Sequence, residues 1–262
     1  MKILFWNVQR LGSGTPTRRK EVFEAVFAEA VVVRDVEYAL FCEISASLIA
    51  SDGNTINKQL MMAKRTKKKS SGQLGYAGLT ADMTELPLVK ADLPSHDEVF
   101  GMPSWRKGGN YFDRISKRMV GHVGKLGGRD IYCYHANASA LGGMLVAWAA
   151  AHLHQKHKGK FVLLGDLNAE PGNVQTQLQW RKIDPGHFVC ATGGSTHNAK
   201  TDLKTTYDYA IGGNGNDLQV TALNIRDTVR EFTRTQNGVN DGNLDSTTNE
   251  NMSDHLPIIV EF

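Results

Sequence analysis

Residues 160–171 read KFVLLGDLNAEP, an apolar run that ends at Gly165 and Asp166 and continues to Asn168. The unbroken run of large apolar side chains predicts a buried strand over residues 160–164. Polar side chains that directly follow a buried strand lie at the edge of a sheet, where layered proteins bind their ligands. The stretch therefore predicts a sheet protein with Asp166 and Asn168 at one rim.

The same pattern recurs along the chain. Strands are predicted over residues 3–8, 36–42, 129–134, 207–211 and 256–262, and helices after Thr17 and over residues 141–157. Polar residues at or just beyond the strand ends are Asn7, Glu43, His135, and Asp254 with His255. Strands from distant parts of a chain can bring such groups to one rim of a sheet.

The composition is that of a folded, soluble protein. The 262 residues are 41% hydrophobic and 22% charged with a net charge of +3, which excludes a disordered, collagen-like or coiled-coil chain. The most apolar stretch, residues 141–153, is too short to cross a bilayer, and the N-terminus lacks the pattern of a signal peptide. Three widely spaced cysteines, Cys42, Cys133 and Cys190, argue against a disulfide framework. A single cytoplasmic domain over residues 1–262 is the expectation.

The strand-end residues suit chemistry on a phosphate. Carboxylates and carboxamides without a thiolate suit Mg²⁺ or Mn²⁺, and two histidines beside such an ion suit proton transfer. Each residue alone also fits a structural role: Glu43 a surface residue, His135 a satisfied core histidine, and Asp254 with His255 a strand cap. Their order and shared strand-end placement favour the functional interpretation.

Six segments together resemble a known family. They are Asn7 in FWNV, Glu43 in FCE, His135 in YHANA, residues 165–171 (GDLNAEP), residues 207–211 (YDYAI) and residues 253–257 (SDHLP). In this order they are similar to the motifs of the endonuclease/exonuclease/phosphatase superfamily. Within it, the resemblance is strongest to the deoxyribonuclease I and cytolethal distending toxin B subunit families. Two departures are Cys42, where the family usually has Gln, and the carboxylate that supports His135, for which Glu85 is the candidate.

The resemblance implies an α/β fold, a four-layer α/β/β/α sandwich with two mainly antiparallel sheets. It implies a metal site of Asn7, Glu43 and Asp254. It also implies a catalytic set in which His135 donates to the phosphate or leaving oxygen, Asp166 activates water, Asn168 binds a phosphate oxygen, and Asp208 orients His255 as acid or base.

The function that follows is a Mg²⁺-dependent endonuclease, with Mn²⁺ as a possible substitute, that hydrolyses DNA with little sequence specificity. A basic segment, formed by Lys64, Arg65, Lys67, Lys68 and Lys69, fits a contact to the DNA backbone as well as it fits a solvated loop. Arg118 is expected to reach a phosphate. The alternatives are a phosphoinositide-type phosphatase using the same metal site and a catalytically idle binding protein.

Overall fold

The structure is a computed structural model of the whole chain. The residues that it describes are 1–11, 17–44, 47–49, 55–57, 61–62, 75–91, 93, 118–138, 142–180, 188–197, 205–213, 217–225, 227–228 and 253–262.

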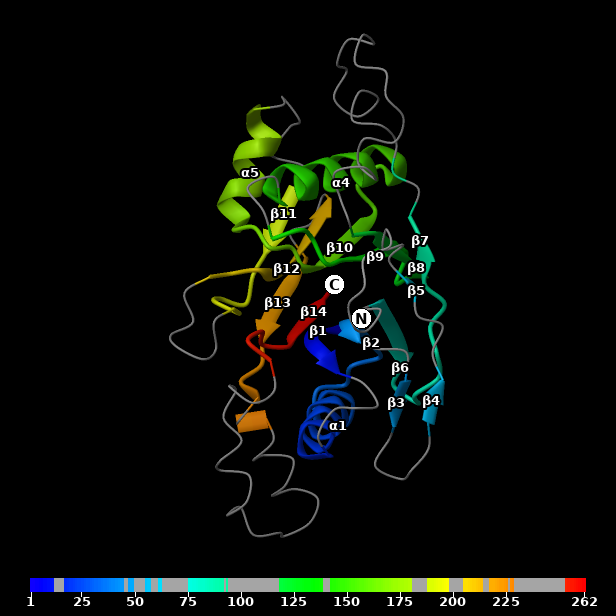
Figure 1. The fold of residues 1–262 in the computed structure, drawn as a ribbon. Helices are drawn as coiled ribbons and strands as arrows, with labels where there is room; N and C mark the ends of the chain where they lie inside the picture. Colours follow the sequence, from blue (N-terminus) through cyan, green and yellow to red (C-terminus); the bar gives the residue numbers. More distant parts are fainter. Residues whose placement is uncertain are drawn as a thin grey trace.

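Two six-stranded sheets form the centre of the molecule (Figure 1). The first has the order β13 (Gln219–Ala222), β14 (Ile258–Glu261), β1 (Lys2–Leu11), β2 (Tyr38–Ile44), β6 (Gly75–Thr80) and β5 (Met61–Met62). The second has the order β11 (Phe188–Ala191), β12 (Asp208–Gly213), β10 (Phe161–Asp166), β9 (Arg129–Tyr134), β8 (Val120–Leu126) and β7 (Val89–Lys90). A separate hairpin joins β3 (Ser47–Ile49) to β4 (Thr55–Asn57).

Helices cover the outer faces of the two sheets. In Figure 1, α1 (Thr17–Val32) lies below the first sheet, while α4 (Gly142–His157) and α5 (Pro171–Trp180) lie above the second. Each sheet has one parallel pair among antiparallel neighbours: β1 with β2, and β9 with β10. The predicted four-layer sandwich with mainly antiparallel sheets is confirmed.

Three apolar layers hold the sandwich together, and β1 shows how the sequence builds them. Ile3 and Phe5 pack into the core between the sheets, whereas Leu4 and Trp6 pack into the core under α1. Successive side chains of a strand point to opposite faces, so a continuous apolar run is needed where both faces are covered. The third core lies between the second sheet and α4, whose residues 145–151 are all buried.

The two parallel pairs place the predicted residues at one edge of the sandwich. Parallel strands run to the same edge of a sheet, and Asn7 on β1 pairs with Cys42, the residue before Glu43 on β2. By the same rule, His135 follows β9 next to Asp166, the last residue of β10. Gly165 is required for the second pair, since a Cβ there would lie 1.9 Å from the carbonyl oxygen of Tyr134.

The strands and helices predicted above are present, with bounds that differ by a few residues. Two differences affect the site, because Glu43 and Asp166 lie inside β2 and β10 and not beyond them. Strands β3 to β8, β11 and β13 and helix α5 were not predicted. The basic segment lies outside the described residues. Of the helices that the described residues form, none is both long and apolar enough to cross a membrane.

Candidate active site

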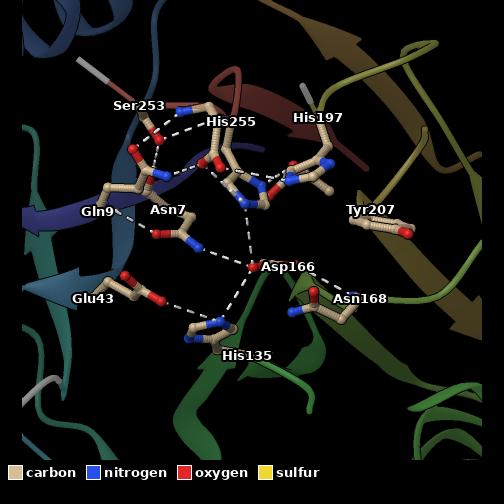
Figure 2. Close-up of polar contacts among 12 residues, drawn as sticks. Asn7, Gln9, Glu43, His135, Asp166, Asn168, His197, Tyr207, Ser253 and His255 are labelled. Carbon is tan, nitrogen blue, oxygen red and sulfur yellow. Dashed lines mark hydrogen bonds and ion pairs between the residues drawn. The ribbon is translucent and has the colours of Figure 1, made fainter. Parts of the chain in front are cut away.

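The Asp166 carboxylate is where polar side chains from both sheets meet (Figure 2). Asn7 Nδ2 donates a hydrogen bond of 2.8 Å to Asp166 Oδ2. The same oxygen lies 3.2 Å from His135 Nε2 and 3.6 Å from His255 Nε2. Asp166 is buried, so this carboxylate is surrounded by protein donors in place of water.

His255 is held in one orientation from several sides. Its Nδ1 lies 2.8 Å from Asp208 Oδ2, and the Asp208 backbone N–H is itself bound by Thr196 Oγ1 at 2.9 Å. The backbone N–H of His255 donates to Ser253 Oγ at 3.1 Å, and Trp6 Nε1 donates to the His255 carbonyl at 3.0 Å. These contacts leave Nε2 of the ring directed toward Asp166. The arrangement has the logic of a carboxylate-oriented imidazole.

The environment separates the proton affinities of Asp166 and His255. Burial raises the pKa of Asp166 to about 6, although the positive charge of His255 opposes the change, and the Asp208 carboxylate adds to it. Burial acts against a charge on His255, but the carboxylates of Asp208 and Asp166 outweigh it and raise the pKa of His255 to about 10. At neutral pH the pair is therefore a carboxylate beside an imidazolium.

His135 differs from His255 in its charge. Its backbone N–H donates to the Tyr76 hydroxyl at 2.7 Å, and this hydroxyl donates to the Met119 carbonyl at 2.7 Å. Burial lowers the pKa of His135 well below its ordinary range, and the positive charge of Arg118 acts in the same direction. The ring is neutral at pH 7, with Nε2 3.5 Å from Glu43 Oε1.

Three residues of the site have left-handed backbone conformations. The φ angles are +43° at Gln9, +57° at Glu43 and +46° at Asn168, which non-glycine residues rarely adopt. Glu43 sits at an irregularity of β2, where the pairing passes from Cys42 to Ile44 on both neighbouring strands. Such bulges redirect side chains next to active sites, and strained backbone gathers there.

Asn168 and Arg118 share one acceptor beside the central carboxylate. Asn168 Nδ2 and Arg118 Nη1 each donate to the Ala136 carbonyl at 3.0 Å. The Asn168 backbone N–H donates to Asp166 Oδ1 at 3.2 Å. The structure therefore places both of these predicted residues next to Asp166, with further N–H groups for an anion.

Asp254 lies in a group that includes two residues the sequence did not indicate. Gln9 Nε2 donates to Asp254 Oδ1, and the Asp254 backbone N–H donates to Gln9 Oε1 at 3.2 Å. His197 Nε2 lies 3.6 Å from Asp254 Oδ2, and the His197 and His255 rings are 4.7 Å apart. Gln9 could have been found from its i,i+2 spacing to Asn7, which puts both on one strand face. His197 meets Asp254 and His255 more than fifty residues further along the chain, and it follows no predicted strand, although it also contacts the nearby Thr205 and Tyr207.

The donor atoms fit a divalent cation, although not all lie together. Among the described residues, the His, Asp and Glu groups close enough to share an ion are Asp166/Asp208/His255 and His197/Asp254/His255. Glu43 belongs to neither group. Burial, with the charges of Asp166 and Glu43, raises the pKa of Cys42, so this thiol is neutral next to an oxygen-rich site. The joint binding of one ion by Asn7, Glu43 and Asp254 stays a prediction.

Glu85 lies away from the site. It forms a bridge to Leu79, which pairs with Ala39, four residues before Glu43 on β2. His135 contacts the carboxylates of Glu43 and Asp166 in place of the one that Glu85 was expected to supply.

Comparison with known proteins supports the fold. No family model matches the chain, and no curated protein does. Among solved structures, a chain of the cytolethal distending toxin from Actinobacillus actinomycetemcomitans is 12% identical at a TM-score of 0.55, covering 99% of this chain and 97% of that one. The Haemophilus ducreyi toxin gives 13% identity and a TM-score of 0.52, with coverage of 99% and 97%. The endonuclease domain of the telomere-specific retrotransposon TRAS1 gives 12% and 0.51, with coverage of 100% and 97%.

Proposed function

We propose that this chain, which has the fold of the endonuclease/exonuclease/phosphatase superfamily, is a divalent-metal-dependent endonuclease that hydrolyses DNA phosphodiester bonds with little sequence preference. The observation that carries the proposal is the Asp166 carboxylate, which contacts the Nε2 atoms of His135 and His255 at 3.2 and 3.6 Å. A base, two imidazoles and an oriented second carboxylate at one rim are what phosphodiester hydrolysis needs.

The oxygen-rich side of the site suits Mg²⁺. Glu43, Asn7 and Asp254 would hold the ion, and their carboxylate and carboxamide oxygens are the donors that Mg²⁺ prefers. A bound divalent cation would neutralise charge on the phosphate oxygens and on the leaving oxygen.

Asp166 is the group that takes a proton. With a pKa of about 6 it is ionised at pH 7, yet more basic than an ordinary carboxylate. A base is most effective when its pKa lies near the working pH. Asp166 would accept the proton of the attacking water while the water oxygen bonds to phosphorus.

His255 is the group that gives a proton. Its pKa of about 10 keeps the ring protonated at pH 7, and Asp208 holds the ring so that Nε2 lies beside Asp166, where a phosphate would bind. As the bond to the leaving oxygen breaks, this proton would pass to the alkoxide. His135, being neutral, would donate a hydrogen bond to a phosphate oxygen, as would Asn168.

Arg118 supports a phosphate substrate. Its guanidinium is held by the Ala136 carbonyl beside Asn168, and a guanidinium matches the geometry of a phosphate better than any other side chain does. DNA is favoured over a lipid headgroup because the cationic residues of the basic segment belong to no catalytic motif. A duplex presents phosphates well outside the active site, and cations there can bind them.

Nicking of supercoiled plasmid tests the proposal. Wild-type protein should nick DNA with Mg²⁺, EDTA should stop it, and His255→Ala should lower the rate by on the order of 10²-fold. His122→Ala is the matched control. This histidine also contacts a carboxylate, with Nε2 3.1 Å from Asp130 Oδ1, but it lies outside the group around Asp166. Absence of nicking by wild-type protein would refute the proposal. Faster release of phosphate from phosphoinositide vesicles would replace it with the phosphatase.

A further inference from the structure

We propose that His197, Asp254 and His255 form a binding site for Zn²⁺ or a similar transition-metal ion, and that an ion bound there switches the enzyme off. The binding half concerns these three side chains alone, whereas the inhibitory half rests on the proposed function. The site differs from the oxygen-rich one because it has two imidazole nitrogens and does not include Glu43.

The spacing of the donor atoms matches a tetrahedral ion. Zn²⁺ bonds to nitrogen and oxygen ligands of about 2.0–2.2 Å place neighbouring ligand atoms about 3.4 Å apart at the tetrahedral angle. Asp254 Oδ2 lies 3.6 Å from His197 Nε2, and Asp254 Oδ1 lies 3.5 Å from His255 Nε2. The donor atoms of all three residues lie within 4.8 Å of one another. These separations leave room for an ion between the side chains.

Both imidazoles are oriented by their other nitrogen. His197 Nδ1 lies 3.0 Å from Thr205 Oγ1, and His255 Nδ1 lies 2.8 Å from Asp208 Oδ2. Metal-binding histidines almost always have such a partner, which fixes the ring and directs the free nitrogen toward the ion.

The backbone holds the three ligands in register. His197 and His255 face each other across an antiparallel bridge, and His197 forms a second bridge with Thr205. Gln9 binds Asp254 through both its side-chain amide and its side-chain carbonyl. The site needs little rearrangement to accept an ion, because each ligand is fixed by a contact that metal binding leaves intact.

Donor type selects the ion. Two imidazoles with one carboxylate and an open fourth position are a common Zn²⁺ set, while Mg²⁺ prefers octahedral oxygen ligands. Glu43 and Asn7 offer oxygen, and His197 and His255 offer nitrogen. Asp254 is common to the two ligand sets, so Zn²⁺ should lie on the imidazole side of this carboxylate and Mg²⁺ on its Glu43 and Asn7 side.

Occupation by Zn²⁺ would be incompatible with catalysis. His255 Nε2 is both a ligand of the proposed site and the atom that carries the proton for the leaving oxygen. A metal bond to this nitrogen removes that proton, so the acid is lost while the ion is bound. Activity in constant Mg²⁺ should fall as Zn²⁺ rises.

Titration calorimetry with zinc chloride on the metal-free full-length protein tests the binding. His197→Gln removes one ligand and should weaken Zn²⁺ binding more than tenfold. Thr205→Val removes the hydrogen-bond partner of His197 Nδ1 and should weaken Zn²⁺ binding by about tenfold. Loss of a group that orients a metal ligand typically lowers metal affinity by about 10- to 100-fold. His122→Gln is the matched control, since it removes an imidazole that also contacts a carboxylate but lies outside the proposed site. Co²⁺ should give the visible absorption of a tetrahedral site in the wild type and the control alone.

The same variants test the inhibition. Each protein is compared with itself in constant Mg²⁺: added Zn²⁺ should lower the nicking rate of the wild type and of His122→Gln, and should leave the rate of His197→Gln at its own zinc-free value. Equal Zn²⁺ affinity in the wild type and His197→Gln would overturn the proposal, as would equal loss in His197→Gln and His122→Gln. If Zn²⁺ binding depends on His197 and no variant nicks DNA, the metal site stands and the nuclease function fails.

Discussion

Replacement of Asp208 by Asn should move the pH dependence of the enzyme through His255. Asp208 Oδ2 lies 2.8 Å from His255 Nδ1, and both residues are buried. The substitution keeps the shape of the side chain and removes its charge, so the imidazolium loses its nearest stabilising carboxylate.

The size of the effect follows from the environment of His255. A pKa of about 10 instead of the ordinary 6.5 corresponds to a preference of about 5 kcal/mol for the charged ring. Asp208 is the strongest of the charges that favour it, and an adjacent opposite charge changes a pKa by about 1–3 units. The pKa of His255 in Asp208→Asn should therefore fall to between about 7 and 9.

Activity and stability should both report this change. The alkaline limb of kcat should move down from about pH 10 by the same 1–3 units, and kcat at pH 7 should fall by roughly 10- to 100-fold because the ring is less well oriented. A raised histidine pKa stabilises the folded state fully below the unfolded pKa, and this stabilisation is lost as pH rises through the folded pKa. The wild type should lose it between about pH 6.5 and 10, and the variant at lower pH.

The measurements are NMR titration of the His255 ring in metal-free protein and the pH profile of cleavage of a nitrophenyl phosphodiester. Asp217→Asn is the control, because Asp217 is an exposed partner of Arg129 outside the site. An alkaline limb and a His255 titration that both stay in place in Asp208→Asn would refute the reasoning.

Other substitutions separate metal, catalysis, substrate and fold. Glu43→Gln should raise the Mg²⁺ concentration needed for half-maximal nicking, and wild-type activity in limiting Mg²⁺ would contradict its metal role. His135→Ala should lower kcat by on the order of 10²-fold with unchanged circular dichroism; near-normal turnover would remove His135 from the mechanism. Replacing the five cations of the basic segment with Gln should flatten the salt dependence of DNA cleavage by roughly one unit of slope per lost contact, and leave a nitrophenyl diester unaffected. An unaltered slope would mean that the segment does not bind DNA. Gly165→Ala should lower the free energy of unfolding by about 3 kcal/mol or more in urea titration, because its Cβ would meet the Tyr134 carbonyl; a wild-type midpoint would contradict that clash.

The sequence could predict the strands that are buried on both faces. Strands β1, β2, β9 and β10 each contain a run of apolar side chains, and a polar residue of the site lies within the strand or directly after it, where it stands out against that run. Strands β6 (GYAGLT) and β8 (VGHVGKL) contain glycine at positions where an apolar side chain would mark the period. At Gly78 a Cβ would lie 2.9 Å from Leu88 Cδ1, so the packing requires glycine there. That same glycine interrupts the apolar pattern from which β6 could have been predicted.

The candidate site was predictable where a residue's position followed from its own strand. Asn7 lies where the regular pairing of β1 with β2 is interrupted, His135 directly follows β9, Asp166 is the last residue of β10, and the structure brings the three together. Tyr76 and His197 reach the site through contacts with residues about 60 positions away, which local sequence does not encode. For the same reason, the positions of strand ends alone could not predict that Glu43 lies outside the group of donor atoms around Asp254.

The two sheets meet at the site through side chains, and this links activity to the core between them. The Asn7–Asp166, Glu43–His135 and His255–Asp208 contacts all run from the first sheet to the second. These contacts join groups from different sheets, so His255, the proposed acid, and Asp166, the proposed base, keep their separation only while the sheets keep their relative position.

That position is set by the apolar layer between the sheets, where Phe5 and Ile258 face Val162 and Ala210. A misplacement of about 1 Å can cost 10²-fold in rate. A substitution in this layer that lets one sheet slide would therefore separate base from acid while leaving every catalytic side chain in place. Under the proposed function, the packing of the inter-sheet core would therefore be constrained by chemistry as well as by stability.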